Sequence, residues 1–153
     1  MKTLPHRPLA VMTLTVDFSA IVPIGPTRPG MRAIAPITGG RCTGERLNAS
    51  VRPGQDWFIG QADGLAIDVR LTLDTDDGAV LYLSYTGAMR APPEVMARFR
   101  KGELLAKDDY RLTIVARFEC GDPRYAWLND ALVIGVGEQT LHGPVYHLFE
   151  VAA

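Results

Sequence analysis

Apolar and polar residues alternate along much of this chain, most clearly between Leu65 and Leu73. Four aliphatic residues, Ile67, Val69, Leu71 and Leu73, are interleaved there with Ala66, Asp68, Arg70 and Thr72. Successive side chains of a strand point to opposite faces, so the pattern predicts a half-buried β-strand with an aliphatic core face. The segment from Asp74 to Gly78 ends in Asp-Gly, which is typical of a tight turn. We therefore expect a hairpin with the strand from Ala79 to Gly87.

The rest of the chain is divided into similar short runs by 15 glycines and 11 prolines. The predicted strands are Leu9–Phe18, Met31–Arg41, Glu45–Val51, Trp57–Gly60, Leu65–Leu73, Ala79–Gly87, Tyr110–Cys120, Ala131–Val136 and Pro144–Val151. The proline- and glycine-rich segment from Pro23 to Gly30 is expected to be an ordered loop. Only Pro92 to Lys101 has helical spacing of apolar residues after a proline pair. The pattern predicts an all-β single domain over residues 1–153, an antiparallel β-barrel of about eight strands with one short accessory helix.

Charge and cysteine content narrow the choice of partners and compartment. Sixteen basic and 17 acidic residues leave a net charge of -1, so no overall field attracts nucleic acid or anionic lipid. Cys42 and Cys120 lack the spacing of a zinc site, and we expect both to be reduced, as in a cytoplasmic protein. The apolar stretch from Pro8 to Val16 is too short for a membrane helix and runs directly into Asp17, so we interpret it as a strand.

No motif for a nucleotide, a metal or a serine nucleophile is present in the sequence. Gly39-Gly40 and Gly135-Val-Gly137 lie between strand-like runs and not between a strand and a helix. The three histidines, His6, His142 and His147, lack ligand spacing, and there is no GxSxG elbow. We therefore expect neither a cofactor nor a metal. The partner that the pattern favours is a small organic ligand.

Asp68 and Arg70 share one face of the clearest strand. If that face lines the barrel interior, the two charges must pair or bind a ligand, because an isolated buried charge is very costly. If it faces outward, they are a solvated pair, which agrees with the aliphatic residues being the core face. The pattern leaves both orientations open.

A dense cluster of aromatic and polar residues runs from Arg124 to Asn129. If this segment is extended, Trp127 and Asn129 lie on one side and form an apolar wall beside an amide. The alternative is a corner plug in which Asn129 caps backbone groups. A second candidate segment is Asp56-Trp57, where a carboxylate adjoins an aromatic ring.

Many short segments, in order, carry a resemblance to a known family. They are Val22-Pro-Ile-Gly25, Gly30-Met-Arg32, Gly39-Gly40, Gly44, Arg52-Pro-Gly-Gln-Asp-Trp57, Asp63-Gly64, Asp68-Val-Arg70, Thr75-Asp-Asp-Gly78, Gly87, Phe118-Glu119 and Tyr125-Ala-Trp-Leu-Asn129. Together they resemble the bacterial and fungal domain of unknown function 3237, also called uncharacterised protein family 0311. This resemblance implies an antiparallel barrel similar to allene oxide cyclase and lipocalin-like (calycin) barrels, and no established reaction. The chain departs from the family at Tyr110-Arg-Leu-Thr113, which puts a family arginine there in doubt.

The resemblance directs attention to the polar positions that recur in the family. If these line a pocket, the candidates here are Asp56, Trp57, Asp68, Arg70, Glu119, Trp127 and Asn129. Tyr85, on the second strand of the predicted hairpin, joins them as a wall residue.

Our first functional hypothesis is a cofactor-independent lyase or isomerase that hydrates or cyclises a small, partly apolar metabolite. Asp68 or Glu119 would transfer the proton, and Arg70 with Asn129 would stabilise negative charge on oxygen. Asp56, Trp57, Tyr85 and Trp127 would contact the ligand. The alternatives are a non-catalytic carrier or sensor of an apolar ligand, and a protein-interaction module with a filled barrel. A homodimer is expected only from the general frequency of symmetric dimers.

Overall fold

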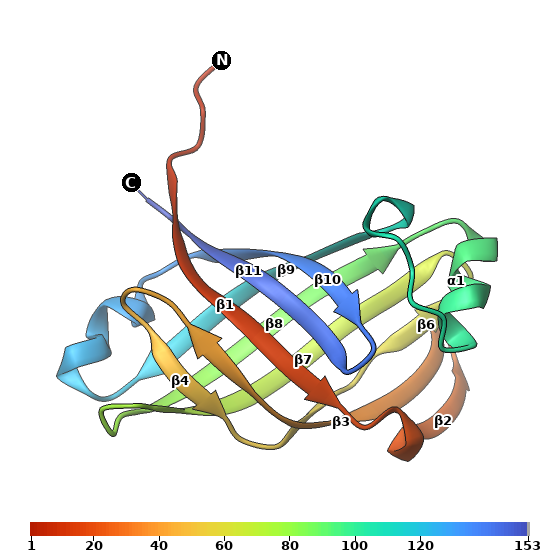
Figure 1. Cartoon of the computed structure of the whole chain (residues 1–153), viewed down its shortest axis with the longest axis horizontal. Helices are drawn as coiled ribbons and strands as arrows, with labels where there is room; N and C mark the ends of the chain where they lie inside the picture. The colour runs from red at the N-terminus through yellow and green to blue at the C-terminus, as the bar shows by residue number, and fades with distance from the viewer. Residues whose placement is uncertain (153) are drawn as a thin grey trace.

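The computed structural model describes residues 1–152 and consists mainly of β-strands (Figure 1). The strands are β1 (His6–Val16), β2 (Val22–Thr27), β3 (Gly30–Thr43), β4 (Asn48–Val51), β5 (Gly54–Asp56), β6 (Ile59–Gln61), β7 (Gly64–Thr75), β8 (Val80–Arg90), β9 (Arg111–Cys120), β10 (Val133–Thr140) and β11 (Gly143–Val151). The α-helix is α1 (Pro93–Arg100), and three short 3-10 helices are η1 (Phe18–Ala20), η2 (Lys107–Asp109) and η3 (Pro123–Asn129). Within residues 1–152, no helix has both the length and the apolar character needed to cross a membrane.

The sheet closes on itself because β1 pairs with β11 on one edge and with β3 on the other. The strand order is β1-β11-β10-β9-β8-β7-β4-β3, and all pairs are antiparallel. The short strands β4, β5 and β6 all lie between β3 and β7, so they share one of the eight positions around the barrel. The predicted all-β antiparallel barrel of about eight strands is confirmed, and α1 is its accessory helix.

The predicted hairpin is present with a continuous ladder from Gly64 opposite Arg90 to Asp74 opposite Val80. Its turn contains Gly78 with φ of 94°, a left-handed conformation that glycine adopts at little cost.

The expected loop from Pro23 to Gly30 is wrong, because β2 occupies Val22–Thr27. This strand pairs with the first half of β3 and is the last strand in the sheet order, so it lies at an edge. Prolines such as Pro23 and Pro26 are tolerated there, since an edge strand leaves N–H positions unpaired.

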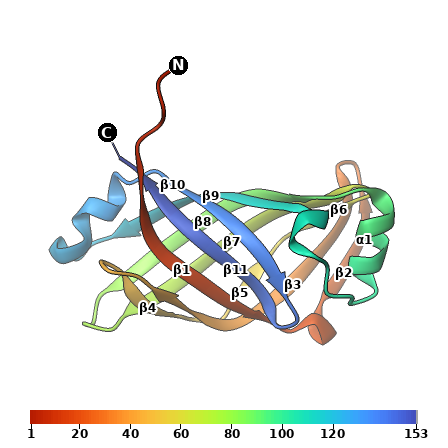
Figure 2. The same ribbon diagram turned by 45° about the horizontal axis from the view of Figure 1, so that its top comes forward.

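The two ends of the barrel differ in how they are filled. Figures 1 and 2 show α1 beside β6 at one end and the helical segment η3 at the opposite end. Near η3 the interior is packed with fully buried side chains, among them Leu47, Leu73, Leu81, Phe118 and Leu128. The α1 end, in contrast, encloses free space. The cavity described below lies at the α1 end.

Candidate functional site

An apolar cavity of about 520 Å³ lies inside the barrel at the α1 end. Its volume is within the range of small-molecule sites. Its walls are mainly apolar residues: Leu14, Val16, Phe18, Ile21, Pro23, Met31, Ala33, Ala35, Ile37, Phe58, Leu65, Ile67, Phe99, Leu104, Leu141 and Pro144. Its polar lining comes from Arg32, Asp56, Tyr85, Arg100, Glu103, Gln139, Thr140 and Tyr146.

Asp56 brings a carboxyl group to the wall of this cavity. It is the last residue of β5 and lies opposite Ala35 of β3 and Val69 of β7, both buried in the barrel. Its Oδ1 accepts a hydrogen bond of 3.2 Å from the backbone N–H of Asp68. Burial raises the pKa of Asp56 to about 7, and the charge of Asp68 adds to this, while that backbone N–H and the charge of Arg32 act in the opposite direction. Asp56 therefore exchanges a proton near neutral pH.

Two tyrosines reach the same cavity from two strands that are separated by β9 and β10 in the barrel. Tyr85 is on β8 and Tyr146 is on β11, and their rings lie edge to face with centroids 5.6 Å apart. Burial raises the pKa of both phenols, and the negative charge of Asp56 raises each further. Both phenols are thus neutral hydrogen-bonding groups at physiological pH, placed within electrostatic range of the Asp56 carboxyl.

Two arginines line the cavity, and each is held by a backbone carbonyl beside β6. Arg32 of β3 donates from Nη1 to the carbonyl oxygen of Trp57, and Arg100 at the end of α1 donates from Nη2 to that of Gln61. In the described part of the chain neither arginine takes part in an ion pair. The second carboxylate of the lining, Glu103, is bound by Arg98 outside the cavity at 2.8 Å.

This arrangement suits proton transfer to and from a bound organic molecule. Asp56 is the titratable group near neutrality, the tyrosines are donors, and the walls are mainly apolar. No group of three or more histidine, cysteine, aspartate or glutamate residues within 1–152 is placed to hold a metal ion.

Asp68 and Arg70 lie on the outer face of β7, which is the solvated one of the two orientations that the sequence left open, so the catalytic role considered for them in the interior does not fit their position. Their side chains are 41% and 51% exposed and form an ion pair of 3.0 Å. The reason is the alternation itself, because Ile67, Val69 and their aliphatic partners occupy the inner face. Trp57 lies outside as well, with its ring 5.7 Å from the guanidinium carbon of Arg70.

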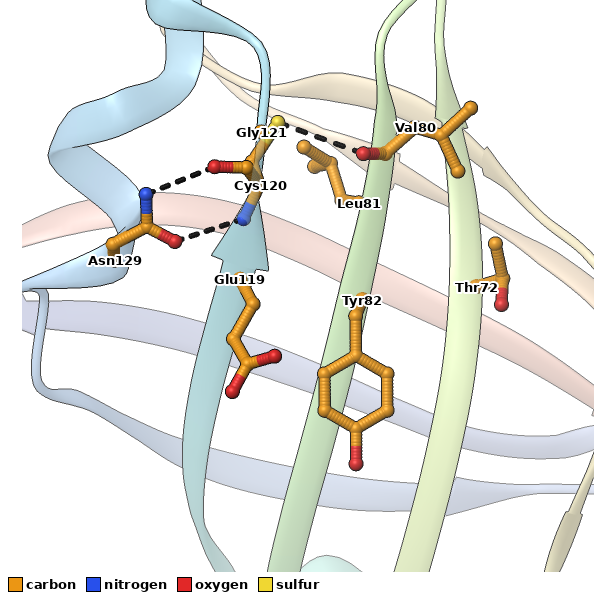
Figure 3. A pocket seen from close by; sticks show the side chains of 8 residues that line it. All are labelled: Thr72, Val80, Leu81, Tyr82, Glu119, Cys120, Gly121 and Asn129. Carbon is orange, nitrogen blue, oxygen red and sulfur yellow. Dashed lines mark hydrogen bonds between the residues drawn. The ribbon is translucent and has the colours of Figure 1, made fainter.

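Glu119 and Asn129 border a hollow on the outer surface of β7, β8 and β9, also lined by Thr72 and Tyr82 (Figure 3). Glu119 is exposed and lies opposite Tyr82 in the ladder. Both polar atoms of the Asn129 amide are used by the backbone of Cys120, since Oδ1 accepts from its N–H at 2.8 Å and Nδ2 donates to its carbonyl at 2.9 Å. This is the capping arrangement, and it leaves Asn129 far from the interior cavity.

Trp127 belongs to η3, so the extended conformation considered for its segment is wrong. Asp122 caps this helix by accepting from the backbone N–H of Arg124. The guanidinium of Arg46 lies 4.1 Å from the centre of the Trp127 ring and also binds the Glu150 carboxylate. Trp127 therefore belongs to the filled end of the barrel.

Of the eight predicted site residues, the structure brings Asp56 and Tyr85 together in the cavity. The sequence interpretation missed Arg32 and Tyr146. A signal for Tyr146 was present, because it alternates with Leu148 on the last strand and faces away from the exposed His147. No comparable signal marked Arg32.

Comparison with known proteins finds relatives whose sequences match nearly the whole chain. A family model described as "Protein of unknown function (DUF3237)" matches residues 7–151. A UPF0311 protein of Rhodopseudomonas palustris is 32% identical over 127 residues, which are 82% of this chain and 83% of the relative. A UPF0311 protein of Clostridium acetobutylicum is 26% identical over 136 residues, covering 88% and 85% of the two chains.

Solved structures share the fold along the same length. A conserved protein of unknown function from R. palustris has a TM-score of 0.90 at 27% identity, covering 99% of both chains. A β-barrel-like protein from Acinetobacter baumannii has a TM-score of 0.80 at 30% identity, also over 99% of both chains. A structure described as an enzyme from Penicillium herquei has a TM-score of 0.73 at 16% identity, covering 99% of this chain and 98% of that one. At that identity the last match concerns the fold alone.

Proposed function

This chain belongs to the DUF3237 family of proteins of unknown function, and we propose that its barrel binds a small, partly apolar carbonyl compound and isomerises it by proton transfer through Asp56. The observation that carries the proposal is a carboxyl group with a pKa of about 7 on the wall of an apolar cavity of about 520 Å³. A general base works best with a pKa near the working pH. A barrel of this fold is described as an enzyme in P. herquei, which supports a catalytic use of the architecture by analogy.

The proposed step needs no external oxidant or reductant. The Asp56 carboxylate takes a proton from the carbon beside the substrate carbonyl, and the electron pair of the broken C–H bond forms a C=C bond. The negative charge moves to the carbonyl oxygen, where a neutral phenol of Tyr85 or Tyr146 donates a hydrogen bond. In a substrate with a C=C bond β,γ to the carbonyl, the enolate extends over that bond. The Asp56 carboxylic acid then returns the proton to the γ-carbon, which moves the C=C bond into conjugation with the carbonyl and completes an isomerisation. Ring closure or loss of a leaving group from the same enolate would give a cyclase or lyase.

Hydrogen–deuterium exchange tests this step without knowledge of the natural substrate. Enolisable ketones of different size, namely 2-tetralone, 4-phenyl-2-butanone and 2-decanone, are incubated with the protein in D₂O, and the α-proton signal is followed by NMR. We expect the wild type to exchange at least one ketone about 100-fold faster than Asp56→Asn, because a positioned general base contributes about that much or more. The rate should rise with pH through about 7, as the carboxylate forms.

Glu119→Gln is the matched control, since it removes a carboxylate from the outer surface. It should exchange like the wild type. Asp68→Asn should also keep at least half of the rate, although it removes a charge that contributes to the raised pKa of Asp56. Equal exchange by wild type and Asp56→Asn would overturn the proposal. Binding of these ketones without any acceleration would favour the carrier hypothesis instead.

A further inference from the structure

The cavity combines apolar walls with two arginine side chains that have no carboxylate partner in the described structure. Within the lining, the acidic residues are Asp56 and Glu103. Glu103 is bound by Arg98, and Asp56 is about half neutral near pH 7 and outside ion-pair range of Arg32. The lining therefore has a surplus of positive charge, although the whole chain carries a net charge of -1.

Arg32 is the deeper of the two arginines. It is half-buried, lines the cavity and lies near enough to Asp56 for its charge to oppose the raised pKa of that carboxyl. The structure records one hydrogen bond from its guanidinium, to the carbonyl of Trp57. A guanidinium has five N–H donors in a fork that matches a carboxylate, so a partly desolvated arginine held by one carbonyl has donors to offer.

Arg100 occupies the outer part of the same lining. Its side chain is exposed at the end of α1, and the bond from Nη2 to the Gln61 carbonyl fixes it beside β6. Exposed charges attract ions more weakly than buried ones because water and salt screen them. Arg100 thus adds attraction at the entrance, while Arg32 makes the stronger contact.

We propose that the molecule bound in this cavity carries an anionic head group, a carboxylate or a comparable oxyanion, which pairs with Arg32, and an apolar body that fills the space beside Tyr85 and Tyr146. The inference rests on the proposed function, since it names the substrate class of the same cavity. An apolar pocket without a cation would reject a charged head group, because removing that charge from water is costly. Arg32 compensates for this cost.

A pair of fluorescent dyes separates anion recognition from apolar binding. N-phenyl-1-naphthylamine is uncharged, and 8-anilinonaphthalene-1-sulfonate has the same ring system with an added sulfonate. Both gain fluorescence on entering an apolar site. We expect the wild type to bind the sulfonate at least as tightly as the neutral dye. Arg32→Gln should weaken sulfonate binding about tenfold, as expected for a charge-assisted hydrogen bond, and change neutral-dye binding less than twofold.

Arg100→Gln should weaken sulfonate binding about threefold, and added salt should reduce that difference. Arg52→Gln is the matched control, because it removes the same charge from an ion pair with Asp74 on the outer surface. It should bind both dyes like the wild type. Ala33→Trp, which fills part of the cavity, should lose both dyes while its thermal unfolding stays cooperative.

The outcomes distinguish failure of this inference from failure of the proposed function. If the neutral dye binds and Arg32→Gln binds the sulfonate as tightly as the wild type does, the anionic substrate class is wrong and the cavity proposal stands. If neither dye binds the wild type, or both bind Ala33→Trp unchanged, the interior does not accept a ligand and both proposals are overturned.

Discussion

Replacing Asp56 by asparagine should change the stability of the barrel in a pH-dependent way. The unfolding free energy of the variant, compared with that of the wild type, should rise as the pH rises. Burial raises the pKa of Asp56 from 3.8 to about 7 in the folded protein. Because this folded pKa lies above the unfolded one, the stabilisation by the proton is fully present below pH 3.8 and is lost as the pH rises through about 7. Asparagine keeps an oxygen that accepts from the N–H of Asp68 and never becomes charged.

The magnitude follows from the two pKa values. Between pH 5 and pH 8, a group with these values loses about 2.5 kcal/mol of stability, at about 1.36 kcal/mol per pKa unit. This is an upper value, because Asp56 is half-buried and water that reaches the cavity screens its charge. The difference in unfolding free energy between Asp56→Asn and the wild type should therefore grow in favour of the variant by up to about this amount.

Urea denaturation followed by tryptophan fluorescence at pH 5, 6, 7 and 8 measures this difference for both proteins. Effects of pH on all other groups are common to both and cancel. Asp74→Asn serves as the control, because Arg52 lowers the pKa of Asp74 and this carboxylate stays charged throughout the range. Its difference from the wild type should not depend on pH. A flat difference for Asp56→Asn as well would refute the raised pKa and, with it, the proton-transfer role.

Two further predictions concern the packing of the barrel. A Cβ at Gly87 would lie 2.2 Å from the carbonyl oxygen of Thr113 on β9. Gly87→Ala should therefore lower the unfolding free energy by about 1–3 kcal/mol in the same urea assay. An unchanged urea midpoint would contradict this close approach. Burial raises the pKa of the Cys42 thiol to about 12, whereas Cys120 is partly exposed. A thiol reagent at pH 8 should therefore label Cys120 alone in the folded protein and both cysteines in urea. Rapid labelling of Cys42 without denaturant would show that the core opens.

The long strands could be predicted because each keeps the two-residue period over many residues. On β7 and β9 the buried and exposed positions alternate nearly without interruption, and this pattern fixes which face is inside. Strand β2 was missed because three of its six residues are proline or glycine, which normally indicate a loop. Two prolines in six residues are tolerated most easily at an edge, where N–H positions stay unpaired, and whether a strand lies at an edge is a property of the sheet that no local pattern reveals.

The candidate site was harder to predict because its central carboxylate comes from a strand too short to have a period. β5 has three residues, Gly54, Gln55 and Asp56, and from so few positions the inward side cannot be determined. The pairing with β3 and β7 determines it, by placing Asp56 beside Ala35 and Val69. The charges on long strands were conspicuous in sequence for the opposite reason: Asp68 stands out among aliphatic neighbours because it faces water. The long strands of this barrel supply the apolar walls and the two tyrosines, whereas the Asp56 carboxylate comes from a short strand between β3 and β7, where the regular alternation is interrupted.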